Sequence, residues 1–342
     1  MSNQTEGETS PPHAQLIQMG IAYWASKLVL TAAKLKLADR LAVGARTAAD
    51  LAQELNLHAP SLYRFMRTLA GMGILSEVES QTFTLTPLGE ALKTDSPGSA
   101  HATILTLAGD TFSHSFDRLL YSLETGKTGF EQVFGMPIFE YLADHPEEAS
   151  LFSETMIGIH GSEPPAVAAA YDFSQFESIV DVGGATGNML TNILRLHDRP
   201  RGVLFDLPHV VSDAPSLIEG HGLQSRISIE SGSFFESVPS GHDAYILSHI
   251  IHDWDKDECQ RILQNCRRAI NADGKLLIVE MVLPEGDTPH FGKMTDMVML
   301  VVPGGQERTG EEYGTLLRKA DFRLTKVVPT GSDVSVVEAA PA

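Results

Sequence analysis

The stretch IVDVGGATGNM, residues 179–189, combines an apolar run, an acid and three glycines. An apolar run that ends in an acid and leads into a glycine-rich turn is typical of a buried β-strand followed by a helix. Glycine lets the backbone turn tightly and lets a ligand approach the chain closely. The stretch therefore predicts a ligand-binding strand–turn–helix unit; an ordinary tight turn between a strand and a helix is the alternative.

The spacing of the glycines argues against a dinucleotide site. Dinucleotide-binding turns follow the pattern G-x-G-x-x-G, whereas this chain has glycine at 183, 184 and 187. Ala185 and Asn188 stand where the pattern, started at Gly183, needs glycine. Residues 181–192 also contain no lysine of the kind that binds phosphates in a P-loop. A ligand without phosphates is therefore favoured.

Asp206 restricts the class of ligand further. It ends the apolar run VLFD, 19 residues after Gly187. An acid at the end of the second strand can accept hydrogen bonds from both hydroxyls of a ribose. A nucleoside that is positively charged and lacks phosphate, such as S-adenosylmethionine, fits these acidic surroundings.

The second half of the chain alternates short apolar runs with helical stretches. The runs are ESIVDV (177–182), RGVLFDLPHV (201–210), SRISIESGSFF (225–235), HDAYILSHII (242–251) and GKLLIVEMVL (274–283). Such alternation predicts an α/β domain with a parallel sheet covered by helices on both faces. Residues 322–339 predict two more strands that form a hairpin at the edge. We place the start of this domain near residue 170, so that it spans 171–342.

The first half predicts mostly helices. Residues 14–42 carry apolar residues at helical spacing, which predicts one or two helices with a buried face. Two short helices are expected over 47–57 and 58–75, with Thr47 and Ser61 as caps. Alternation at Phe83 and Leu85 predicts a hairpin after them. Helix, turn, helix and hairpin make a winged-helix arrangement.

Three N-terminal segments follow from this pattern. They are a disordered lead-in over residues 1–13, a winged-helix domain over 14–100 and a helical connector over 101–170. The polar, acidic start lacks the basic and apolar regions of a signal peptide. We also expect no membrane span, because no stretch approaches about 20 apolar residues.

Charge and cysteine content indicate the compartment and the partners. The chain of 342 residues has a net charge of −19; residues 1–100 carry 8 Lys and Arg against 9 Asp and Glu, and the rest carries 17 against 35. This acidity disfavours nucleic acid as a partner. Cys259 and Cys266 lie seven apart on one expected helix, so we expect no disulfide and a cytoplasmic location.

Six segments in order carry a resemblance to a known family. They are VDVGGATG, FDLPHV, GSFFESVP, HDWDKDECQRIL, VEMVLPEG and GGQERTGEEY. With them the chain, over residues 15–338, resembles the caffeate/hydroxyindole-type small-molecule O-methyltransferases. The resemblance implies a Rossmann-like class I methyltransferase domain preceded by a winged-helix dimerisation domain. It also implies a homodimer that uses S-adenosylmethionine, releases S-adenosylhomocysteine and methylates an aromatic hydroxyl of a small molecule in specialised metabolism.

The resemblance implies roles for named residues. His252 is implied as the general base, with Glu280 and Glu307 beside it; one orients the imidazole and the other braces it or the substrate. Asp181 and Gly183 are implied at the methionine end of the cofactor, with Asp206 on the ribose. The remaining implied cofactor positions are Gly184, Leu207, Ser233, Phe234, Ser248, Asp253 and Trp254. Those implied around the acceptor are Phe139, Met156, His160 and Met297.

The chain departs from the family pattern at three positions. Ala185 replaces a glycine of the loop, Ser233 replaces an acid often found beside the adenine, and Ser248 replaces a lysine of plant relatives. These changes affect the expected affinity for the cofactor more than the fold. Asp253 has a second interpretation, since an acid also suits the start of the helix that follows.

The chemistry expected at His252 is partial proton transfer. A phenol has a pKa of about 10 and histidine about 6.5, so the imidazole cannot remove the proton fully before methyl transfer. We expect His249, inside the apolar run, to hydrogen-bond within the core or line the cofactor side. His249 and His252 lack a third partner with metal-ligand spacing, so no metal is expected.

Three other functions stay open at this point. The same fold can use S-adenosylmethionine for hydroxylation or decarboxylation of a polyketide, or for N-methylation of an aromatic heterocycle. The winged helix, with Arg64 and Arg67 on its second helix, also allows a DNA-binding regulator. The near-neutral charge of residues 1–100 disfavours that last function.

Overall fold

The computed structural model describes residues 10–94 and 96–342. They form two compact units, one of Met1–Ser113 with His145–Ile159 and one of His114–Asp144 with His160–Ala342. The helices of residues 101–170 are divided between these units. Residues 1–9 of the expected lead-in lie outside the described residues, and the first helix begins at Pro12.

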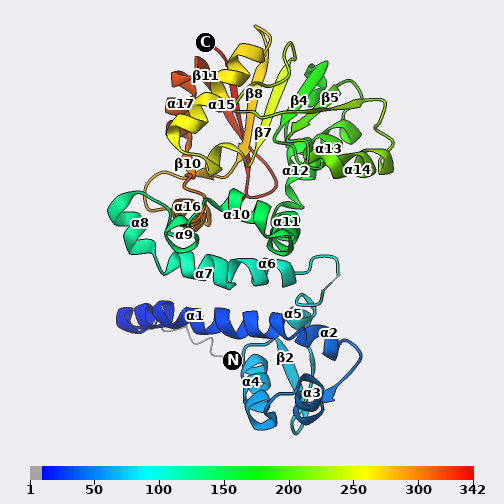
Figure 1. Ribbon diagram of the computed structural model, residues 1–342, viewed down its shortest axis with the longest axis vertical. Helices are drawn as coiled ribbons and strands as arrows, with labels where there is room; N and C mark the ends of the chain where they lie inside the picture. Colours follow the sequence, from blue (N-terminus) through cyan, green and yellow to red (C-terminus); the bar gives the residue numbers. More distant parts are fainter. Residues whose placement is uncertain (1–9, 95) are drawn as a thin grey trace, which may run out of the picture. The chain divides into compact units, whose positions relative to one another are not determined.

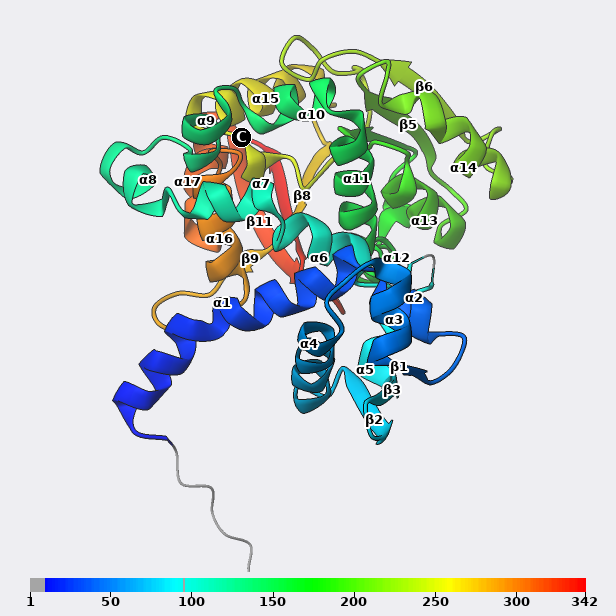
Figure 2. The ribbon, with the colours of Figure 1, turned by 60° about the horizontal axis from the view of Figure 1, so that its bottom comes forward.

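The first unit contains the expected winged helix. Its elements are α1 (Pro12–Lys34), α2 (Leu37–Leu41), β1 (Arg46–Thr47), α3 (Ala48–Leu55), α4 (Ala59–Gly71), β2 (Leu75–Glu79), β3 (Thr82–Leu85), α5 (Pro87–Glu90), α6 (His101–Leu107), α7 (Asp110–Phe116, which continues into the second unit) and α11 (Pro146–His160, of which His160 belongs to the second unit). The strands pair in the order β1-β3-β2, beside α3 and α4 (Figure 2). Met66, Leu69 and Phe83 are fully buried in its core.

One predicted cap is right and one is wrong. The Thr47 side chain accepts a hydrogen bond from Asp50 N–H at the start of α3. Ser61 does not cap α4, because that helix already begins at Ala59 with His58 at its N-cap. Pro60 in the first turn suits an earlier start, since proline needs no hydrogen bond there.

Helix α1 differs from the expectation of a helix with a buried face along its length. Its N-terminal half is not buried in the chain, since Leu16 and Met19 are each 70% exposed and Trp24 is 54% exposed. Only Leu30, Ala32 and Ala33 of this helix are buried. The helix is also long and apolar enough to cross a membrane by length and composition, with a mean hydropathy of 1.2. The same two properties fit a helix that a protein partner covers.

The second unit is built on a seven-stranded sheet. Its strands are β4 (Ser178–Val182), β5 (Arg201–Asp206), β6 (Ile227–Ser231), β7 (Ala244–Ser248), β8 (Lys275–Glu280), β11 (Phe322–Pro329) and β12 (Ser335–Pro341), in the order β11-β12-β8-β7-β4-β5-β6. β4 to β8 run parallel, whereas β12 pairs antiparallel with β8 and with β11. The predicted strands and the edge hairpin are confirmed.

Helices cover both faces of this sheet (Figure 1). One face packs against α12 (Glu163–Ala170), α13 (Asn188–Leu196) and α14 (Ala214–Gly220), and the other against α15 (Lys256–Ala269) and α17 (Gly310–Lys319). Successive residues point to opposite faces: Ile179 belongs to the first core and Val180 to the second. This is the predicted Rossmann-like class I arrangement.

This unit also contains further helices and strands. They are α8 (Leu119–Thr125), α9 (Gly129–Phe134), α10 (Ile138–Asp144), η1 (Phe173–Gln175), η2 (Val211–Asp213), η3 (Ile251–Asp253), β9 (Val282–Leu283), α16 (Gly292–Val301) and β10 (Arg308–Thr309). β9 and β10 pair in parallel, Arg308 beside Val282. This pairing brings the segment that contains Glu307 close to the end of β8.

Candidate active site

The polar residues predicted for the site lie at the carboxyl ends of neighbouring strands. Asp181 is next to last in β4, Asp206 ends β5, Ser248 ends β7 and Glu280 ends β8. In open parallel sheets, ligands bind at this edge, because strand ends and helix starts meet there. The strand register therefore places residues from four separate segments at one edge.

The glycine turn after β4 is tightly packed. Gly183 has a φ of +72°, and a Cβ on it would lie 2.4 Å from Ile250 Cδ1. A Cβ on Gly184 would lie 2.6 Å from Asp181 Cγ. Ala185, which stands where the family pattern has glycine, still takes the left-handed conformation, with a φ of +50°. Its N–H donates to Asp206 Oδ2 at 3.0 Å, which ties the turn to β5.

Asp181 is a fully buried acid. Its side chain is fully buried, and neither carboxylate oxygen has a hydrogen bond among the described residues. Burial raises its pKa to about 7. A buried acid of this kind is stabilised by a cation or hydrogen-bond donor supplied by a ligand.

Asp206 is held by the backbone. Leu207 N–H donates to its Oδ1 at 2.7 Å, in addition to the bond from Ala185 to Oδ2. Burial raises its pKa, although both backbone donors act in the opposite direction. Leu207 itself is 40% exposed, so its side chain does not close this edge of the sheet to solvent.

Four further cofactor candidates surround this edge. Ser233 Oγ accepts a hydrogen bond from Phe235 N–H at 3.3 Å, and Ser248 is half-buried. The rings of Phe234 and Trp254 have centroids 6.1 Å apart, and Phe235 lies edge-on to Trp254 at 4.8 Å. The rings of Phe234 and Trp254 offer a flat apolar surface, and the side chains of Ser233 and Ser248 carry no charge.

Asp253 does not start the helix. Helix α15 begins at Lys256, and its cap is Asp255, whose side chain accepts from Asp257 N–H and Glu258 N–H. Asp253 lies in η3, with its Oδ1 3.6 Å from His252 Nε2. Its helix-start interpretation is therefore wrong, because the chain makes an extra short turn before α15.

His252 and Glu307 form a buried pair. His252 Nδ1–H donates to Glu307 Oε1 at 2.9 Å, and the residues are 8% and 2% exposed. Because this bond occupies Nδ1, Nε2 is the ring nitrogen that exchanges a proton, in the tautomer that a carboxylate partner selects. Burial lowers the pKa of His252, but the charge of Asp253 and the hydrogen bond and charge of Glu307, together with that of Glu280, raise it to about 10.

Glu280 contacts the backbone and not the imidazole. Its Oε1 accepts from Ile251 N–H at 2.7 Å and from His252 N–H at 3.1 Å. Tyr313 Oη donates to its other oxygen, and burial raises the pKa of Glu280. The geometry thus separates the two glutamates that the sequence left interchangeable: Glu307 orients the ring and Glu280 braces the segment that carries it.

A glycine loop holds Glu307 in place. Gln306 N–H donates to His252 O at 2.8 Å, and Glu307 N–H donates to Asp296 Oδ1 at 2.9 Å. A Cβ on Gly305 would lie 1.8 Å from His252 O, so only glycine fits there. Sequence reasoning missed Gly305, although the pair GG before QE was a visible signal for such a turn.

The acceptor candidates divide between the two units. In the second unit, Phe139 on α10 is 40% exposed, with its ring 5.7 Å from Trp254, and Met297 on α16 is half-buried. Met156 on α11 belongs to the first unit. His160 begins the second unit and does not stand alone, because its Nδ1 lies 3.1 Å from Glu163 Oε1.

His249 has partners that the sequence did not suggest. Its Nε2 lies 2.6 Å from Glu163 Oε2, and its ring centroid lies 3.9 Å from that of His160. The bond to Glu163 agrees with the expectation that His249 hydrogen-bonds within the core. The group that it forms with His160 and Glu163 does not include His252. Glu163 was missed because it lies 86 residues earlier in the chain. The only sequence signal was its i,i+3 spacing from His160.

Two family models match the chain. The first, described as an O-methyltransferase domain, matches residues 116–323, and the second, an O-methyltransferase dimerisation domain, matches residues 17–95. The phenazine O-methyltransferase PhzM of Lysobacter antibioticus is 41% identical over the full length of both chains.

Two solved structures have the same fold. The O-methyltransferase NcsB1 from neocarzinostatin biosynthesis, in complex with S-adenosylmethionine and 2-hydroxy-5-methyl naphthoic acid, matches with a TM-score of 0.82 and 31% identity. The match covers 93% of this chain and 96% of NcsB1. The second structure is RosA, the N,N-8-amino-8-demethyl-D-riboflavin dimethyltransferase of Streptomyces davawensis, which matches with a TM-score of 0.84 and 30% identity. This match covers 97% of this chain and all of RosA. The chain therefore belongs to the O-methyltransferase family and carries both its methyltransferase and its dimerisation domains.

Proposed function

We propose that this enzyme transfers a methyl group from S-adenosylmethionine to an aromatic hydroxyl of a small molecule, with His252 as general base. The observation that carries the proposal is the buried His252–Glu307 pair beside the carboxyl ends of the parallel strands. NcsB1, a relative with this fold, binds S-adenosylmethionine together with a hydroxylated aromatic acid.

The residues around the glycine turn fit this cofactor. Asp181 supplies a buried carboxylate without a partner among the residues described, and the cofactor carries an ammonium and a sulfonium. Gly183 and Gly184 let the turn pack closely against Ile250 and Asp181, and Asp206 is suited to the ribose hydroxyls. When bound, the cofactor supplies the electrophilic methyl group. Gly184, Leu207, Ser233, Phe234, Ser248, Asp253 and Trp254 complete the proposed cofactor site.

His252 would take the hydroxyl proton at Nε2. Because Glu307 accepts from Nδ1–H, the imidazolium that forms keeps a charged partner. The pKa of His252, raised to about 10, is close to that of a free phenol, so the proton transfer is nearly balanced once the imidazole is neutral. At neutral pH most of the imidazole is protonated, so the amount of the base form, and with it the rate, should increase as the pH rises towards 10. General bases in such positions contribute about 10²–10⁴-fold to the rate.

The acceptor we propose is a planar, hydroxylated aromatic ring system of the phenazine type. PhzM, the 41% identical relative, carries phenazine in its name. Phe139, His160 and Met297 of the second unit are the proposed contacts, and Phe139 and Met297 offer flat or flexible apolar surface. The part of Met156, which belongs to the first unit, stays a prediction from the family resemblance. N-methylation is the second candidate, because RosA is an N,N-dimethyltransferase with this fold. Parallel assays with hydroxyl and amino forms of one ring system separate the two.

The proposed assembly is a cytoplasmic homodimer formed through the N-terminal domain. The exposed apolar residues of α1 lie in or beside the segment matched by the dimerisation model. Both cysteines are free and buried, which suits a reducing compartment. Proposed partners do not include nucleic acid or a membrane.

Calorimetric titration with S-adenosylhomocysteine tests the cofactor assignment. We expect one binding site per chain, and a clear loss of affinity in Asp206→Asn. An absence of heat with both S-adenosylhomocysteine and S-adenosylmethionine would overturn the proposed function as a whole.

A further inference from the structure

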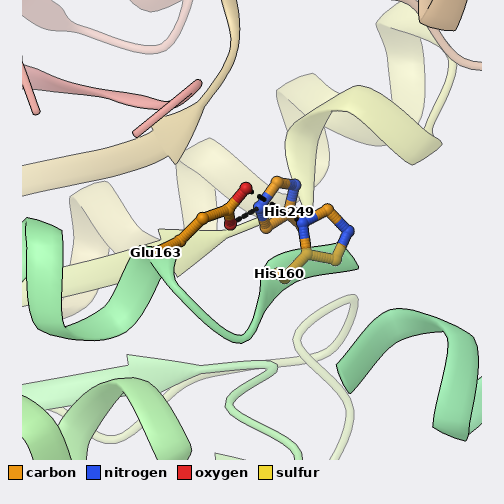
Figure 3. Close-up of side chains that lie close together, drawn as sticks. All are labelled: His160, Glu163 and His249. Atoms are coloured by element: carbon orange, nitrogen blue, oxygen red, sulfur yellow. Dashed lines mark hydrogen bonds and ion pairs between the residues drawn. The ribbon is translucent and has the colours of Figure 1, made fainter. Parts of the chain in front are cut away.

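Two histidines and a glutamate converge beside the proposed active site. His160 ends α11, Glu163 begins α12, and His249 follows β7; all three side chains belong to the second unit. Figure 3 shows both imidazoles facing the Glu163 carboxylate, one at each oxygen. The nitrogen–oxygen distances are 3.1 Å for His160 and 2.6 Å for His249.

The cluster has the donor atoms of a ligand set. It offers two imidazole nitrogens and two carboxylate oxygens, held together by hydrogen bonds between Glu163 and each histidine. Neutral imidazoles and ionised carboxylates are the forms that bind metal ions.

His249 also holds an unfavourable backbone conformation. Its φ is +53°, in the left-handed region that residues other than glycine seldom adopt, although histidine is found there more often than most. Such conformations persist where the surroundings fix them, and they occur often at functional sites. The conformation turns the side chain out of the apolar strand and onto Glu163.

We propose that His160, Glu163 and His249 bind a divalent transition-metal ion of the zinc class. Their ligand atoms all lie within 4.8 Å of one another. Bonds of about 2.0–2.1 Å at a tetrahedral angle separate ligand atoms by about 3.3 Å, so small side-chain rotations admit the ion. Two imidazoles and one carboxylate suit Zn²⁺, Co²⁺, Ni²⁺ or Fe²⁺, and they leave coordination positions open.

The site is expected to bind its ion exchangeably. Coordination through His249 Nε2 moves the ring proton to Nδ1, which is buried without a partner in the described part of the chain. Strong sites give the second ring nitrogen an acceptor, which this one lacks. His160, with 24% of its side chain exposed, provides access from solvent.

The ion would lie next to the proposed base. The ring centroids of His249 and His252 are 5.1 Å apart. An open coordination position there can take an oxygen of the acceptor and favour its ionised form. This consequence rests on the proposed function, whereas the binding of the ion does not.

Titration of the tag-free, chelator-treated full-length chain with Co²⁺ and with Zn²⁺ tests the site. We expect one Co²⁺ per chain, with the visible absorption of a site of low coordination number, and displacement by Zn²⁺. Glu163→Gln and His249→Ala should each weaken binding at least tenfold. His221→Ala, an exposed histidine of the same unit, should leave binding unchanged. A wild-type chain that binds no ion, or variants that bind as tightly as wild type, would overturn the inference.

A second readout separates this inference from the proposed function. S-adenosylhomocysteine binding is measured on the same metal-free samples. Intact cofactor binding without ion binding contradicts only the metal site, and ion binding without cofactor binding contradicts only the proposed function. Circular dichroism of Glu163→Gln, which is nearly isosteric, confirms that a loss of ion binding is not a loss of fold.

Discussion

Glu307 is expected to set the pH at which His252 can act. Its hydrogen bond and charge both raise the pKa of His252, so Glu307→Gln should lower that pKa. The ring would then become neutral at lower pH, and the rising limb of kcat/KM should move to lower pH. The maximal rate should fall as well, because the amide holds the imidazolium less well. A pH profile of both enzymes checks this.

The control for this profile is Glu311→Gln. Glu311 is an exposed acid four residues further along, outside the site. An unchanged profile is expected there. A Glu307→Gln profile that coincides with the wild-type profile would contradict the role given to Glu307.

Asp181 is expected to lower the stability of the cofactor-free protein at neutral and alkaline pH, although it contributes to cofactor binding. Its folded pKa of about 7 exceeds its unfolded value of about 3.9. The unfolded state therefore loses this proton first, and stability falls as pH rises from about 4 to about 7. Without cofactor, Asp181→Asn should be roughly 1–4 kcal/mol more stable at pH 8, and equal at pH 4. Urea unfolding at both pH values measures this.

The same substitution should impair the cofactor site. S-adenosylhomocysteine should bind Asp181→Asn more weakly, although the variant is more stable. A variant that is less stable than wild type at pH 8 would mean that Asp181 has a favourable partner in the free protein.

At the scale of elements, the loop after α16 is expected to depend on Gly305. A methyl group there would lie 1.8 Å from the carbonyl oxygen of His252, so one of the two segments must move. Gly305→Ala should cost about 1–3 kcal/mol of stability and reduce methyl transfer, because the movement separates Glu307 from His252. Gly331→Ala, where a Cβ meets nothing within 4 Å, is the matched control. Equal melting temperatures for the two variants would refute this.

The strands were predictable because their apolar runs are continuous. Five parallel strands and an edge hairpin follow from local sequence, and the acids at strand ends follow from the same pattern. The contacts of Glu280 and Glu307 could not be predicted from the local sequence, because they depend on the register of β9 with β10 and on the packing of α17. The cluster of Glu163 with His249 joins α12 to the end of β7, and no local pattern encodes that approach.

At the scale of the whole molecule, α1 is expected to form a subunit interface. Its exposed apolar residues, among them Met19 at 70% exposure, are costly to leave in water. Met19→Glu should convert the dimer to a monomer, as measured by light scattering after size-exclusion chromatography. Val43→Glu, at an exposed position of the same unit outside α1, should remain dimeric. A wild-type monomer at micromolar concentration would contradict the assembly.

Transfer of a labelled methyl group tests the central claim most directly. Wild-type enzyme is mixed with methyl-labelled S-adenosylmethionine and a panel of hydroxyphenazines, and the products are identified by mass spectrometry. We expect label on the hydroxyl oxygen of at least one acceptor, with His252→Ala slower by about 10²–10⁴-fold while it still binds S-adenosylhomocysteine. A His252→Ala enzyme that methylates the same acceptor at the wild-type rate would contradict it.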